Sequence, residues 1–314
     1  MALVAAYLTV ILIWSTTPMA IQWSGDGVGP MFGLCARMLI SLILCLLIMR
    51  LFRIEFPREK RAMATYVGGG LGLYAAMTLV YFSSQWIPSG WISVIFGLTP
   101  IMTAIIAMLI IREKFTVMMA AGALLGVFGL GIIFTHGDDN GTARSLGVLL
   151  VLLAAMVHAL SAVTVKKFGA ALHPLASTSG GLLVAVPLYL LTWWFSDGSL
   201  PDTIPLKSAV GFIYLGVVGS VLGFSLYFYL LKRCSASQVA LVTLVTPICA
   251  LMLGQWFNHE PLTQHVIWGG LFVISGLICY QWGESLVRLI TSVFTGLGRQ
   301  RRRVFKYGSK RVEF

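Results

Sequence analysis

Long apolar stretches alternate with short polar connections along the chain as far as residue 283. Each stretch is close to the roughly 20 residues that a helix needs to cross the ~30 Å hydrocarbon core of a bilayer. The pattern predicts an all-α integral membrane protein with ten transmembrane helices. We place them at residues 3–22, 31–51, 65–84, 89–111, 117–135, 146–165, 174–195, 208–231, 236–257 and 263–283.

The composition favours the same class of protein. Apolar residues make up 58% of the chain and charged residues 11%, whereas about a quarter of a soluble domain is charged. A water-soluble fold could not cover so much apolar surface. The first apolar stretch has no basic segment before it, so we interpret it as an uncleaved first span and not as a signal peptide. The five cysteines show no CxxC spacing and are expected to be reduced packing residues.

The two halves of the chain repeat one pattern. Residues 89–133 and 236–280 align at a constant offset of 147, which preserves helix breakers, a carboxylate and glycines. The paired residues are Thr99 and Thr246, Pro100 and Pro247, Glu113 and Glu260, Thr116 and Thr263, Gly122 and Gly269, and Gly129 and Gly276. Such a repeat indicates two copies of one structural unit. We predict a first repeat at 1–135, a linker at 136–145, a second repeat at 146–283 and a basic tail at 284–314.

Loop charge predicts the orientation. With the N-terminus inside, nineteen Lys and Arg residues fall on the inner side, only Arg144 and Lys207 on the outer side, and Arg37 within a span. Cytoplasmic loops carry such an excess, so both termini are expected in the cytoplasm. Five spans per half then invert the second repeat relative to the first, an architecture typical of transporters.

The net charge of +11 therefore reflects membrane topology and gives no reason to expect a nucleic-acid partner. The basic tail is open to two interpretations. It is either a solvated topology anchor or an interfacial helix that binds anionic lipid through QRRRVFK.

These features resemble the EamA branch of the drug/metabolite transporter superfamily over residues 3–283. The resemblance rests on a Trp-Ser pair in span one, an Arg early in span two, and a Pro within and a Glu at the end of spans four and nine. The matching residues are Trp14, Ser15, Arg37, Pro100, Pro247, Glu113 and Glu260. The second half departs from this pattern, because His158 stands where span one has Trp14. The resemblance implies an inner-membrane carrier that moves small metabolites, often amino acids, usually outward.

Arg37 is the first candidate for binding substrate. Placing an Arg within hydrocarbon costs about 2.5–3.5 kcal/mol on insertion scales, and no acidic residue occupies a span interior to offset that cost. Its guanidinium could bind a substrate carboxylate through two parallel hydrogen bonds. The alternatives are a structural Arg that bonds carbonyls at a kink, or one that reaches toward the interface.

His158 and Trp14 align at an offset of 144 and could line the same cavity from spans one and six. His158 could carry a coupling proton because imidazole titrates near neutral pH. It could equally be a neutral core histidine, which leaves facilitated diffusion or exchange open. Tyr81 and Tyr227 are further candidates for the cavity wall.

Pro100 and Pro247 remove backbone donors in mid-span, which frees carbonyls and allows bending. We interpret both as hinges, with Thr99 and Thr246 facing the cavity; a static, packed kink is the alternative. Glu113 and Glu260 precede Thr116 and Thr263, which are expected to cap the next helices. Both carboxylates are therefore interpreted as junction residues beside helix N-termini.

The sequence gives no sign of a metal site, a cofactor or a catalytic residue. The segment from His259 to His265 lacks the HExxH spacing, and Pro261 breaks the helix that it would need. We therefore expect a transporter that is not an enzyme and that exports amino acids or related carboxylates by alternating access. A carrier of nucleotide-sugars or lipid-linked sugars is one alternative. A membrane scaffold that acts through its basic tail is another.

Overall fold

The computed structural model describes residues 2–135, 141–169, 172–196, 198–223, 226, 230 and 236–285. Tyr227 and tail residues 286–314 lie outside these described residues. Within the described part, every regular element is a helix. Among the described residues, seven helices are long and apolar enough to cross a membrane, and Val117–Ile133, Leu206–Leu222 and Val242–Asn258 are shorter apolar helices. The all-α class is therefore confirmed, while the count of ten spans stays a prediction.

The first half contains six helices. They are α1 (Ala2–Gly25), α2 (Pro30–Leu51), α3 (Lys60–Ser83), α4 (Ser89–Phe96), α5 (Thr99–Ile111) and α6 (Val117–Thr135). The second half contains α7 (Gly141–Gly169), α8 (Pro174–Ser196), α9 (Leu206–Tyr214), the π-helix η1 (Leu215–Leu222), α11 (Ala236–Asn258) and a last helix, Gln264–Ser285. Pro30 and Pro174 begin the second helix of each half, where the missing N–H costs nothing.

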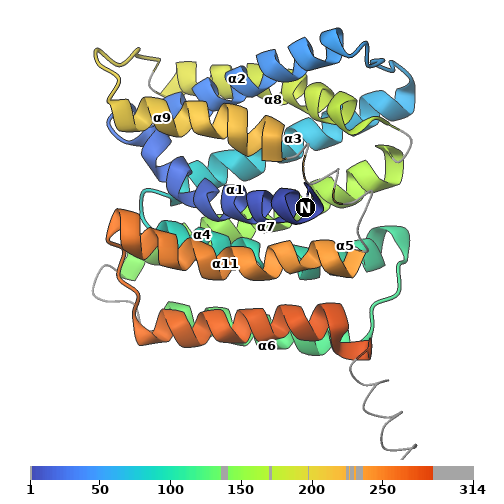
Figure 1. The fold of residues 1–314 in the computed structure, drawn as a ribbon, viewed down its shortest axis with the longest axis vertical. Helices are drawn as coiled ribbons and strands as arrows, with labels where there is room; N and C mark the ends of the chain where they lie inside the picture. Colours follow the sequence, from blue (N-terminus) through green and yellow to red (C-terminus); the bar gives the residue numbers. More distant parts are fainter. Residues whose placement is uncertain are drawn as a thin grey trace, which may run out of the picture.

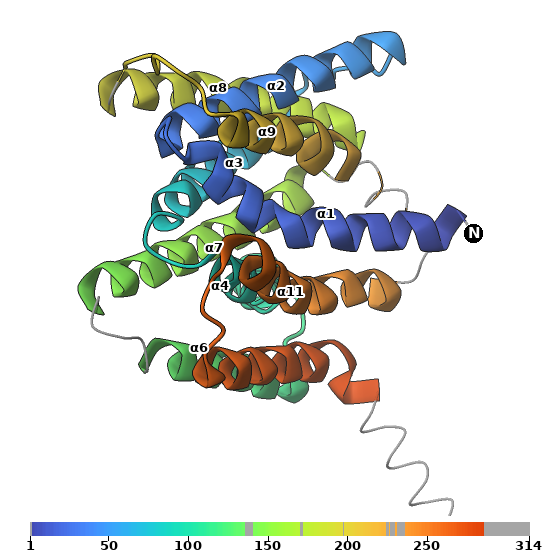
Figure 2. The same ribbon diagram turned by 60° about the vertical axis from the view of Figure 1, so that its left-hand side comes forward.

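Helices from the two halves pack against each other throughout the bundle (Figures 1 and 2). Helix α2 packs on α8, α3 on α7 and α8, α1 on α9 and α11, and α4 on α11. At the bottom of Figure 1, the last helix lies along α6. The largest buried cluster is built from both halves, and it includes Tyr81 of α3 and Tyr189 of α8. The interface between the repeats is thus the core of the molecule.

Equivalent turns end α5 and α11. Arg112 and His259 both have left-handed backbone conformations, with φ of 56° and 54°. The next amide then turns back onto its helix, from Glu113 to the carbonyl of Ala107 at 3.3 Å and from Glu260 to that of Gly254 at 3.1 Å. Each pair of positions is separated by 147 residues, the offset of the sequence repeat. The repeat is therefore a repeat of backbone geometry as well as of residue types.

The two proline segments differ in local structure. The fourth predicted span breaks at Gly97–Leu98 between α4 and α5, so Pro100 lies in the first turn of α5. Pro247 lies inside α11, which continues through it. A Cβ built on Gly97 would be 3.4 Å from Cγ of Pro247. The break in one repeat therefore packs against the proline of the other.

Candidate functional site

Arg37 is buried in the core between the repeats. Its side chain is only 7% exposed, and its Cζ lies 5.9 Å from the centroid of the Tyr81 ring. In the part of the chain that the structure describes, Nε and Nη1 have no hydrogen-bond partner. A buried charge with unsatisfied donors is costly. The arrangement leaves hydrogen-bond donors available for an anionic group.

Tyrosines from α3 and α8 surround this position. Tyr81 is fully buried, and its hydroxyl accepts a hydrogen bond from Ser24 at 3.0 Å. Tyr189 belongs to the same buried cluster as Tyr81 and donates its hydroxyl to the carbonyl of Leu73 at 2.7 Å. Tyr74 packs on Tyr189 with ring centroids 5.2 Å apart. Since these hydroxyls bond within the protein, the aromatic walls are fixed while Arg37 keeps unused donors.

The other predicted site residues fall in two further groups. Ser15 of α1 donates to the carbonyl of Thr246 on α11 at 3.4 Å, and Thr246 donates to Val242 at 2.6 Å. Trp14 packs on the small cluster formed by α1 and the second half.

The last group lies where α7 meets α4 and α5. The side chain of His158 is exposed on α7, and its ring centroid lies 6.1 Å from that of Phe96. Thr99 begins α5 with a buried hydroxyl that has no partner among the described residues. Arg37 and Tyr81 are thus two predicted site residues that the structure brings into contact.

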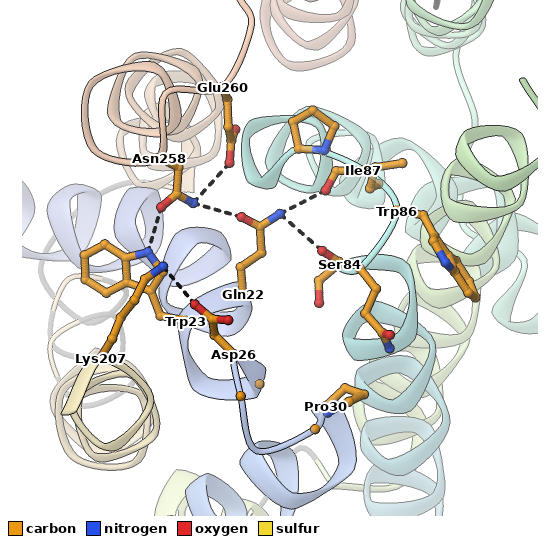
Figure 3. A pocket seen from close by; sticks show the side chains of 15 residues that line it. Gln22, Trp23, Asp26, Pro30, Ser84, Trp86, Ile87, Lys207, Asn258 and Glu260 are labelled. Atoms are coloured by element: carbon orange, nitrogen blue, oxygen red, sulfur yellow. Dashed lines mark hydrogen bonds and ion pairs between the residues drawn. The ribbon is translucent and has the colours of Figure 1, made fainter. Parts of the chain in front are cut away.

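A cavity of about 710 Å³ opens at the end of the bundle where α1 and α11 end and α4 begins (Figure 3). We call this the Glu260 end, and the opposite one the Glu113 end. The wall of the cavity includes Trp23, Asp26, Trp86, Lys207 and Glu260, whereas Arg37 is not among the lining residues. The cavity is therefore a vestibule at one end of the helices, separate from the Arg37 position.

A hydrogen-bond network beside this cavity joins the two repeats (Figure 3). Asn258 donates to Oε1 of Gln22 at 2.9 Å and to Oε1 of Glu260 at 3.2 Å. Its own carbonyl accepts the Trp23 indole N–H at 2.7 Å. Gln22 in turn donates to the carbonyl of Ile87 at 2.9 Å. The network ties α1 and the α3–α4 connection to the end of α11.

Glu260 completes the network by capping a helix of the other repeat. Its two carboxylate oxygens accept the amides of Ser89 at 2.9 Å and Gly90 at 3.2 Å, the first two residues of α4. These amides have no partner within their own helix, and negative charge is favoured there by the helix dipole. The acceptor therefore satisfies an N-terminus that has no side-chain cap of its own.

Sequence reasoning found part of this arrangement. The predicted caps are confirmed, because Thr116 accepts the amide of Met119 at 3.3 Å and Thr263 that of Val266 at 3.4 Å. The partnership of Glu260 with α4 was missed. The available signal was a helix that starts at Pro88-Ser89-Gly90 with no acidic residue in its first turn.

Two ion pairs lie near the ends of the bundle. Lys207 approaches Asp26 at 3.0 Å beside the cavity. At the Glu113 end, Lys166 approaches Glu113 at 2.5 Å, with 59% and 44% of the two side chains exposed. Such solvent-exposed pairs contribute little to stability. The described residues contain no group of three or more His, Cys, Asp or Glu that could hold a metal ion.

Together, the apolar helices and the core shared by two repeats define a multi-pass membrane protein of two-repeat architecture. The chain belongs to the EamA-like transporter family, whose model matches residues 1–135 and 145–281.

Relatives cover most of the chain. The uncharacterized transporter YvbV of Bacillus subtilis is 28% identical over 284 residues, which are 88% of this chain and 90% of that protein. The "Probable terminal-alkyne amino-acid exporter" of Streptantibioticus cattleyicolor is 25% identical over 280 residues, covering 87% and 91%. A solved crystal structure superposes with a TM-score of 0.64 at 17% identity, covering 88% of this chain and 96% of that one. That likeness concerns the fold alone.

Proposed function

We propose that this transporter exports amino acids or related small carboxylates, with Arg37 binding the substrate carboxylate. The observation that carries the proposal is a guanidinium that is 7% exposed and has two donor nitrogens without partners in the described part of the chain. A carboxylate matches the planar fork of an Arg and can accept two parallel hydrogen bonds. Binding of the carboxylate would offset the unfavourable free energy of the buried charge and so favour entry of the substrate.

The surroundings of Arg37 favour an amphipathic substrate. The guanidinium lies over the ring of Tyr81, and Tyr189 and Tyr74 extend the aromatic surface. Aromatic faces bury apolar groups, and the hydroxyls of Tyr81 and Tyr189 are fixed by bonds to the protein. A relative named as a probable amino-acid exporter supports the same substrate class.

The proposal includes a location and a mode of action. We infer a bacterial inner membrane with both termini in the cytoplasm, from the excess of basic residues on one side of the predicted spans. In that orientation the Glu260 end faces outward. Alternating access would rock one repeat against the other around Arg37, with Trp14, His158, Thr99, Thr246 and Tyr227 as further candidates for the path.

Transport measurements test the role of Arg37. Cells that express the protein are compared with cells that express Arg37→Lys or Arg37→Ala at equal membrane levels, and metabolites in the medium are quantified. We expect a carboxylate metabolite to accumulate outside only with the unchanged protein, since Lys keeps the charge and loses the fork. Arg50→Ala is the matched control, because it removes an exposed cation from the last turn of the same helix, α2. Full export by Arg37→Lys would contradict the proposal.

A further inference from the structure

The equivalent carboxylates of the two repeats, Glu260 and Glu113, have different surroundings. Glu260 is half-buried and accepts two amides of α4 and one N–H of Asn258. Glu113, at the equivalent position, is exposed and pairs with Lys166. The backbone turns that carry the two side chains are the same, so the difference comes from what surrounds each carboxylate.

One residue in the preceding helix accounts for part of this difference. Gly254 lies directly beneath the Glu260 carboxylate, and a Cβ at that position would overlap Oε2 of Glu260 and lie 3.3 Å from Oγ of Ser89. The residue 147 positions earlier is Ala107, which is 2% exposed. At the Glu113 end, a methyl group therefore stands at the position that Gly254 leaves open for a carboxylate.

We propose that Glu260 and Gly254 form a one-sided latch that holds the Glu260 end of the transporter closed. The latch joins α11 to the start of α4, and Asn258 extends it to Gln22 and Trp23 of α1. Its members belong to both repeats, so a rocking motion that separates the repeats at this end must break these bonds. The exposed pair at the Glu113 end offers no comparable resistance. The inference goes beyond the proposed substrate, because it concerns which end is closed at rest.

Ser24 is a suitable reporter of this latch. It is fully buried and stands in the chain between the cavity-lining residues Trp23 and Gly25. Its hydroxyl donates a hydrogen bond to the hydroxyl of Tyr81, and Arg37 lies over the ring of that tyrosine. Opening of the Glu260 end would expose it on the path from the vestibule to Arg37. We therefore place Ser24→Cys in a protein whose five cysteines are replaced by Ala, reconstitute it in nanodiscs and measure the rate of maleimide labelling.

Three latch variants are compared in this background. Glu260→Gln removes the charge, and Gly254→Ala displaces the carboxylate without changing any charge. Glu113→Gln is the matched control from the other repeat. We expect the first two to raise the labelling rate by about tenfold, the order of effect produced by removing hydrogen bonds to a charged group. Glu113→Gln should stay within about twofold of the parent, because its ion pair is exposed.

A second reporter separates gate opening from loosening of the whole fold. Thr65 is buried near the start of α3, whereas the end of α3 leads to the cavity. Thr65→Cys should therefore show no faster labelling in the latch variants. Equal acceleration at Ser24 and Thr65 would overturn the proposal, as would unchanged labelling at Ser24 in both latch variants or equal acceleration by Glu113→Gln. None of these measurements requires substrate, so failure of the Arg37 proposal would leave their interpretation unaffected.

Discussion

Gly122 of α6 and Gly276 of the last helix lie against each other with their backbones in contact. A Cβ on Gly122 would be 2.5 Å from the carbonyl oxygen of Gly276, and a Cβ on Gly276 would be equally close to the carbonyl oxygen of Gly122. Gly129 and Gly269 make the same reciprocal contact, at 2.5 and 2.6 Å. The earlier glycine of each helix meets the later glycine of the other, so the helices cross antiparallel. Equivalent helices crossing in this way are what two inverted repeats require.

This crossing makes Gly122→Ala destabilising. The added methyl group must push two helix backbones apart, because the nearest atom is a carbonyl oxygen that cannot rotate away. Overpacking of this kind costs about 1–3 kcal/mol, which we expect to appear as a lower midpoint of thermal unfolding in detergent. Gly131→Ala is the matched control on the same helix, since a Cβ there would meet nothing within 4 Å. Equal midpoints for the two variants would contradict the packing argument.

Replacing Arg37 with Met should separate stability from function. If the role of the guanidinium is to bind substrate, its unsatisfied donors destabilise the protein that has no substrate bound. An apolar side chain of similar length removes this destabilisation. We expect Arg37→Met to unfold at the same or a higher temperature than the parent and to lose export. A lower unfolding temperature would instead support a structural Arg. Binding of a carboxylate substrate should raise the unfolding temperature of the parent only.

Sequence alone predicted the features that repeat or that are local. Apolar runs located the helices, the offset of 147 located the repeats, and Thr116 and Thr263 identified two helix starts because an N-cap bonds an amide three residues away. The family resemblance, carried by residues such as Arg37 and the two prolines, is confirmed by the match of the EamA-like family model to both halves.

The remaining features depend on contacts between the repeats. The bond from Ser89 to Glu260 joins residues 171 positions apart, and no periodic pattern reports which helix N-terminus a distant carboxylate will reach. The tyrosines around Arg37 likewise come from helices in different halves. The break at Gly97–Leu98 was not expected either, because Pro100 was the obvious helix breaker and the actual break precedes it.

The two prolines should therefore differ as hinges. Pro100 occupies the first turn of α5, where the N–H of any residue would have no partner within the helix. The helix break at Gly97–Leu98 lies before this proline. Pro247 lies inside the continuous helix α11, where a proline removes one backbone hydrogen bond. We expect Pro247→Ala to slow the initial rate of transport in proteoliposomes several-fold and Pro100→Ala to change it little. Equal slowing by both variants would show that the hinges work symmetrically.

The pH dependence of transport tests His158. The residue lies beside Phe96, on the helix α7 that packs against α4 and α5. If His158 must be protonated during the cycle, transport by the parent falls as pH rises through the range of about 5 to 8 in which imidazole titrates. His158→Gln keeps a polar side chain that cannot titrate, and we expect it to flatten this profile while exchange of labelled for unlabelled substrate continues. Initial rates in proteoliposomes at matched internal and external pH measure both quantities. A profile that is the same in parent and variant would rule out the proton role and leave facilitated diffusion or exchange.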